Sequence, residues 1–105
     1  MIKVDHTVTT NIENGITIID SQMPDDIPPA FELFRAEAAH RGCFFFNEAN
    51  ENNSVRTSSF VWFDQAVLDD FVEWCNERGY SELYARITAV VEANGGTITK
   101  TVTEI

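Results

Sequence analysis

Apolar and polar residues alternate along the first positions of the chain. The apolar side of this alternation carries Ile2, Val4, His6 and Val8. A period of two is typical of a half-buried strand, so the pattern predicts a strand over residues 2–10.

A turn signal and a second apolar run follow this strand. Asn14 and Gly15 favour the positive φ angles of a tight hairpin turn, and residues 16–19 form a short β-branched run. We therefore expect an N-terminal β-hairpin. A single long bent strand is the alternative for the same residues.

The next segment has helical spacing. Pro28 and Pro29 suit the first turn of a helix, and apolar residues then recur every three or four positions until Arg41 and Gly42. These signals predict a helix over residues 29–41.

Two aromatic runs occupy the middle of the chain. Residues 43–49 and 55–63 are rich in aromatic and β-branched residues, and the polar residues 50–54 separate them. We expect two strands that pair as an antiparallel hairpin.

The last third of the chain predicts a helix pair and a strand. Asp64 is a good N-cap, and helical spacing continues from it to Gly79. For residues 82–93 helix is favoured because Ser81 can cap it, although the β-branched residues also allow a strand. Residues 97–104 alternate as a strand.

The order of these elements predicts the fold class. One strand or hairpin, a helix, two strands, two helices and a strand form the βαββαβ order of a ferredoxin-like plait. We expect one α+β domain over residues 1–105, with an antiparallel sheet, helices on one face and an extra N-terminal β-hairpin.

The central hairpin is unusual because it is apolar on both faces. Phe44 and Phe46 point to one side of the predicted sheet and Phe45 to the other. On the neighbouring strand Val61 and Phe63 point to one side, and Phe60 and Trp62 to the other. Large exposed aromatic patches are rare on monomers. We therefore expect a homodimer through the sheet, with Phe45, Phe60 and Trp62 at the interface. Cover by residues 11–20 is the alternative.

Composition limits the possible partners. The 105 residues include 17 acidic and 7 basic side chains, a formal charge of −10. Because nucleic acids and anionic membranes are bound by clustered Lys and Arg, we expect neither partner. No apolar run approaches the length of a membrane span, and no secretory signal is recognised, so we expect a cytoplasmic protein.

The two cysteines do not suggest a metal site or a cofactor. Cys43 and Cys75 lie 32 residues apart in apolar surroundings, without the paired spacing of zinc ligands. We expect reduced thiols in the core, and neither a metal nor a cofactor.

Three residues are weak candidates for catalysis. His6 lies on the apolar side of the first strand, and Asn47 and Trp62 lie on the two aromatic strands. A pocket between sheet and helices can bring them together, an arrangement compatible with oxygen-dependent chemistry. If the first and last strands are neighbours, His6 lies near Lys100 or Glu104.

At the level of fold, the element order resembles small plait enzymes typified by the antibiotic-biosynthesis-type monooxygenases, which form dimers through their sheets. The resemblance covers most of the chain. It implies a pocket lined by Trp62, Phe45, Asn47 and His6. We expect first a non-catalytic assembly subunit, and as the alternative a cofactor-independent enzyme that binds a small molecule.

Overall fold

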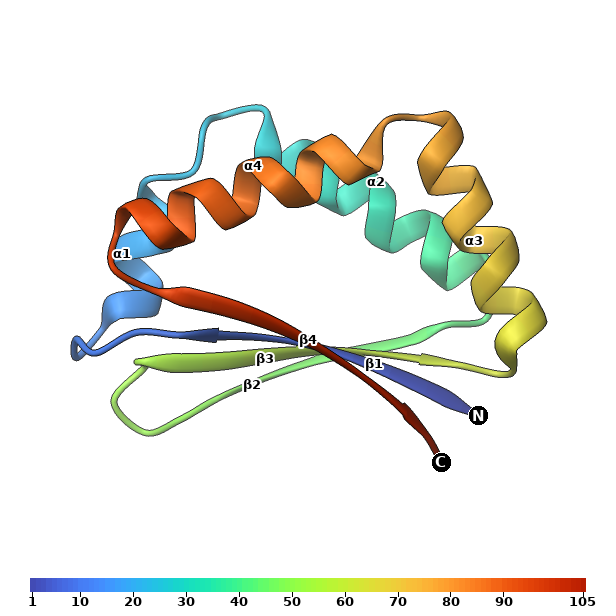
Figure 1. Cartoon of the computed structure of the whole chain (residues 1–105), viewed down its shortest axis with the longest axis horizontal. Helices are drawn as coiled ribbons and strands as arrows, with labels where there is room; N and C mark the ends of the chain where they lie inside the picture. Colours follow the sequence, from blue (N-terminus) through green and yellow to red (C-terminus); the bar gives the residue numbers. More distant parts are fainter.

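The structure, a computed structural model, describes residues 1–105 and has an α+β fold. A four-stranded antiparallel open sheet has the strand order β2-β3-β1-β4. The four helices all lie on one face of this sheet (Figure 1). The elements are β1 (Ile2–Thr9), α1 (Gly15–Ser21), α2 (Ile27–His40), β2 (Phe44–Ala49), β3 (Val55–Trp62), α3 (Gln65–Glu77), α4 (Tyr80–Ala93) and β4 (Thr97–Glu104).

The predicted α+β class and antiparallel sheet are confirmed, and the ambiguous segment 82–93 is helical, as α4. Local signals explain the helix boundaries. The Asp64 carboxylate accepts a hydrogen bond of 3.0 Å from the Val67 N–H at the start of α3. Gly79, with φ of 72°, separates α3 from α4 in the left-handed conformation that glycine adopts without strain.

The predicted N-terminal β-hairpin is wrong. Residues 15–21 form α1, because Ile16 and Ile19 are spaced for one helical face and each is only 2% exposed. On a strand, residues three apart would point to opposite faces. The helix lies on the same side of the sheet as the others (Figure 1), so residues 11–20 do not cover the second face.

Strand register decides which side chains face the helices. Val4 of β1 lies opposite Phe60 of β3 and Val102 of β4, and Phe60 lies opposite Phe45 of β2. Because side chains alternate across a sheet, the neighbouring position Phe44 points to the open face.

The core between sheet and helices has two parts. The larger cluster is built around Val4, Ala38, Phe60, Trp62 and Phe71. The smaller cluster contains Val8, Ile16, Ile19 and Val91. The space between the two clusters is where the candidate site lies.

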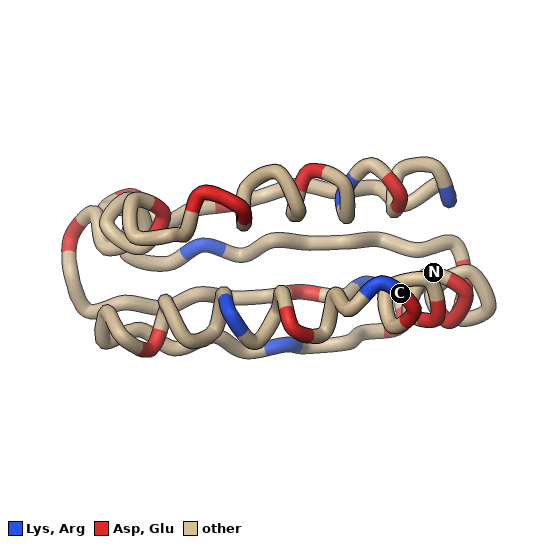
Figure 2. Tube along the Cα trace, turned by 90° about the horizontal axis from the view of Figure 1, so that it is seen from above, with Lys and Arg blue, Asp and Glu red and all other residues tan.

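The charged residues lie mainly outside this core. In the view from above, the acidic positions follow the helices and the connections between elements (Figure 2). None of the helices combines the length and the apolar character that crossing a membrane requires.

Candidate functional site: a cavity beneath the helices

A row of polar residues crosses the helix-facing side of the sheet. From one edge to the other it contains Lys100 on β4, His6 on β1, Ser58 on β3 and Asn47 on β2, each directly opposite the next. The expected proximity of His6 and Lys100 follows from this register. The row on one side of it, which contains Val102, Val4, Phe60 and Phe45, is entirely apolar, so the polar row marks the end of the larger apolar cluster.

A cavity of about 350 Å³ lies over His6, Ser58 and Asn47 of this row, between the sheet and the helices. Its volume falls at the lower end of the range typical of small-molecule pockets. Eleven of its seventeen lining residues are hydrophobic. The lining consists of His6, Val8, Asp20, Met23, Ile27, Pro28, Phe31, Phe34, Asn47, Arg56, Ser58, Phe60, Tyr80, Leu83, Tyr84, Ile87 and Ile98.

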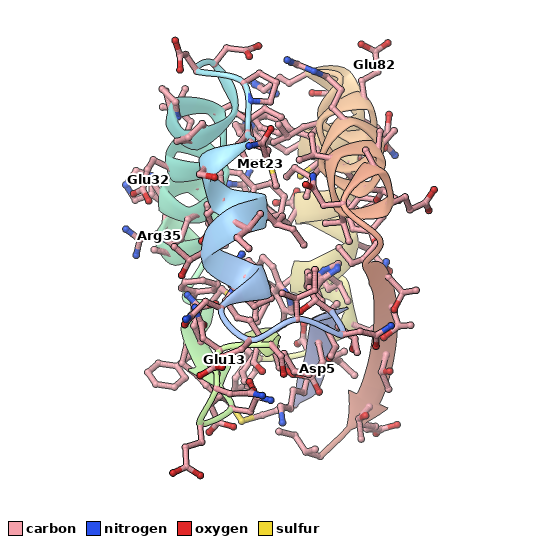
Figure 3. All side chains as sticks on the ribbon, turned by 90° about the vertical axis from the view of Figure 1, so that its left-hand side faces the viewer. Asp5, Glu13, Met23, Glu32, Arg35 and Glu82 are labelled. Atoms are coloured by element: carbon pink, nitrogen blue, oxygen red, sulfur yellow. The ribbon has the colours of Figure 1, made fainter.

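The connection between α1 and α2 contributes to the cavity wall. Met23 is half-buried and lies between α2 and α4, above the sheet (Figure 3). Glu32 of α2 and Glu82 of α4, by contrast, point outward from the molecule, and Arg35 of α2 lies at its side, with the guanidinium 5.7 Å from the centroid of the Phe45 ring. The charged side chains of these helices thus leave the cavity apolar on its helical side.

Two hydrogen-bonded pairs line the sheet side of the cavity. The Ser58 hydroxyl donates to the Asn47 side-chain oxygen at 2.6 Å, which leaves the Asn47 amide nitrogen free to donate. Arg56 donates to both carboxylate oxygens of Asp20, at 2.8 and 3.1 Å. Because this pair is neutral overall, the polar wall has little net charge.

His6 has a buried side-chain nitrogen with unused hydrogen-bonding capacity. Its Nδ1 atom is buried and has no partner in the chain. The imidazole packs against Tyr84 and Phe60, with ring centroids 5.4 and 6.1 Å away. Burial lowers the pKa of His6 below its ordinary value of 6.5; the charge of Lys100 also lowers it, and Asp5 opposes the shift. The ring is therefore neutral at pH 7, with one donor and one acceptor nitrogen.

The structure brings only two of the four predicted pocket residues together at the cavity. His6 and Asn47 line the cavity. Trp62 does not: it is 2% exposed and packs against Phe71, with ring centroids 4.7 Å apart. Phe45 packs on the Phe60 ring at 4.7 Å and is not part of the lining either.

The predicted interface residues also lie on the helix side. Phe60 is 4% exposed, and Trp62 is buried with it in the larger cluster beneath the chain's own helices. Both are therefore core residues, out of reach of a second chain. The exposed aromatics near the open face are instead Phe44 and Phe63, at 64% and 70% exposure.

Several lining residues were not singled out from the sequence. The sequence does contain a signal for Arg56: strand alternation puts it on the same side of β3 as Ser58 and Phe60, which face the helices. Asp20 and Tyr84 had none, since their approach to the sheet depends on contacts between distant segments. No three His, Cys, Asp or Glu side chains cluster as metal ligands.

No protein-family model matches this sequence, and no curated protein matches it either.

Proposed function

We propose that this chain binds a small, planar and largely apolar molecule in the cavity between the sheet and the helices. The observation that carries the proposal is the polar row beneath the helices, above which about 350 Å³ remains unfilled. Polar groups placed in a core cost stability unless they find partners. Departures of this kind from an apolar core are typical of functional sites.

The lining indicates the chemistry of the ligand. Phe31, Phe34, Phe60, Tyr80 and Tyr84 present aromatic rings to the cavity. Ring faces and edges favour a flat aromatic partner. The lining charges of Arg56 and Asp20 neutralise each other, so we propose an uncharged ligand.

The hydrogen-bonding groups of the proposed ligand would face the sheet side of the cavity. The Asn47 amide nitrogen can donate, and the His6 imidazole can donate or accept. A phenol or an aromatic carbonyl compound offers matching groups.

Binding is better supported than oxygen chemistry. The resemblance to the monooxygenases implied four pocket residues, and of these Trp62 and Phe45 lie outside the cavity lining. We therefore propose a binding role, and expect no oxygen uptake above the uncatalysed rate when hydroquinone is added. Uptake that depends on His6 would favour the enzyme instead.

The binding proposal can be tested by NMR titration with phenol, 2-naphthol and indole. We expect saturable shift changes at His6, Asn47 and Tyr84. Ile98→Phe should abolish them by filling the cavity. Val72→Phe is the control, because it adds a ring at an exposed position of α3 that lies outside the lining. Shifts that do not saturate, or that survive Ile98→Phe, would refute binding in the cavity.

A second candidate function is self-assembly through the sheet, as the sequence suggested. The observation that favours it is the low charge of the side without helices. Of the 17 acidic and 7 basic residues, the strands direct only Lys3, Asp5 and Glu48 to that face. Interface centres are depleted of charge, so two acidic chains can meet here with little repulsion.

Two further assignments remain proposals. We propose that the fold is a variant of the ferredoxin-like plait with additional helices, supported by the antiparallel sheet and the single helical layer. We also propose a cytoplasmic location, in keeping with the unpaired Cys43 and Cys75.

A further inference from the structure

Strand β4 is an uncovered sheet edge. It pairs with β1 on one side, and no strand pairs with it on the other. Seven of its eight residues are exposed, and only Ile98 is half-buried. Natural proteins usually protect long edges with proline, bulges or several charges. The sequence of β4 has no proline and carries only Lys100 and Glu104 as charged residues.

The backbone geometry shows which groups this edge offers. The N–H of Ile105 points inward and donates to the Met1 carbonyl at 2.9 Å. In an antiparallel pair, successive residues direct their backbone groups to alternate sides. The N–H and C=O groups of Lys100, Val102 and Glu104 therefore point outward, away from β1.

We propose that β4 pairs antiparallel with β4 of a second copy, with Val102 on the two-fold axis. In this register Lys100 lies opposite the partner's Glu104, and Glu104 lies opposite the partner's Lys100. All of these positions carry outward-pointing backbone groups, so each opposed pair can exchange hydrogen bonds. Val102, which is 55% exposed, packs against the partner's Val102.

Charge selects this register over its neighbours. Moving the axis to Thr101 places Glu104 opposite the partner's Ile98 and leaves both charges unpaired. Moving it to Lys100 places two lysines face to face, which is destabilising. Of these three registers, only the one centred on Val102 pairs each lysine with a glutamate, and the two-fold axis makes this ion pair occur twice.

This pairing is a route to self-assembly separate from packing through the open face, and it does not depend on a ligand in the cavity. It would join two four-stranded sheets into one continuous sheet. The open faces would stay uncovered, which distinguishes edge pairing from face-to-face packing.

Charge-swap variants measured by sedimentation equilibrium test the proposal. Glu104→Lys and Lys100→Glu each place like charges opposite each other twice, so each should weaken the dimer about tenfold or more. A one-to-one mixture of the two variants restores opposite pairs and should recover the dimer. Glu92→Lys on the exposed side of α4 makes the same charge change as Glu104→Lys and should have no effect.

Hydrogen exchange adds a readout specific to the edge. On dimerisation the amides of Lys100, Val102 and Glu104 should gain protection, while those of Thr101 and Thr103, which face β1, should not. A chain that stays monomeric at about 1 mM would overturn both this pairing and self-assembly. A dimer that ignores the charge variants but dissociates on Phe44→Glu would overturn only the edge pairing and favour the open face.

Discussion

Asp20 and Arg56 form a two-pronged ion pair that joins α1 to the sheet at the wall of the cavity. Both guanidinium nitrogens that face the carboxylate take part, at 2.8 and 3.1 Å. The two residues are 36 positions apart in the chain. This pair acts beside the apolar packing of Ile16 and Ile19 and two hydrogen bonds of Asn53, whose carbonyl accepts from the Ile16 N–H at 3.1 Å and whose side-chain amide donates to the Thr17 hydroxyl at 2.7 Å.

Asp20→Asn should loosen α1 without unfolding the protein. The pair is partly exposed, so its loss should reduce the free energy of unfolding by about 0.5–1 kcal/mol. Urea denaturation measures this change, and hydrogen exchange should show faster exchange in residues 15–21. Asp25→Asn, on the connection between α1 and α2, is the control. Equal effects of the two variants would mean that the pair has no structural role.

Protonation of His6 should destabilise the fold. Its pKa is lowered in the folded chain by burial and by Lys100, so between that lowered value and 6.5 the unfolded chain binds more protons. The free energy of unfolding should therefore fall as the pH drops below about 6.5. His6→Gln should reduce this fall between pH 7 and pH 5, whereas His40→Gln should preserve it. An identical pH profile for His6→Gln and the unmodified chain would contradict the prediction.

Trp62 should contribute to the free energy of unfolding rather than to assembly. Trp62→Ala removes a ring that is 2% exposed and packed on Phe71, so the free energy of unfolding should drop by about 3–5 kcal/mol. Phe44→Ala, at a position 64% exposed, should change it by only about 0.5 kcal/mol. Urea denaturation compares the two. Similar losses would show that the two strands are not oriented as described.

The sequence predicts which aromatic residues share a side of their strand, because alternation is a local property. This holds for Phe44, Phe45, Phe60 and Trp62. The face that each set occupies could not, because it depends on where the helices pack. The aromatics assigned to an interface therefore proved to be core residues. The short apolar run of residues 16–19 was ambiguous for a similar reason, since only burial of Ile16 and Ile19 together distinguishes helix from strand.

The candidate site was predictable only along the sheet. Strand alternation places His6 on the same side of its strand as Val4 and Val8, and Asn47 on the same side as Phe45. The expected adjacency of the first and last strands adds Lys100 to this set. Residues contributed by helices, such as Tyr84 and Asp20, reach the cavity through packing between distant segments, and no local pattern encodes those contacts.

Cys43 and Cys75 should be unreactive in the folded protein. Burial raises the pKa of each thiol to about 11, and the nearby Arg41 and Arg78 only partly offset this for Cys75. Since the thiolate is the reactive form, labelling by a disulfide reagent at pH 7.5 should be slow. Unfolding in urea should make both thiols react rapidly. Fast labelling of either thiol without denaturant would contradict the shielding described for it.

Gly15→Ala should be the most damaging single-methyl change near the cavity. Gly15 is buried at the start of α1, and an added Cβ would overlap the Thr10 hydroxyl and lie 2.8 Å from the Thr10 Cβ. Thr10 cannot easily move, because its hydroxyl donates to the Ser54 carbonyl at 2.9 Å. Relief requires α1 to shift away from the sheet, so the free energy of unfolding should fall by about 1–3 kcal/mol. Gln22→Ala, at the exposed end of the same helix, should change it by about 0.5 kcal/mol or less. If urea denaturation gave equal values for the two variants, the close approach of Gly15 to Thr10 would not be what seats α1 on the sheet.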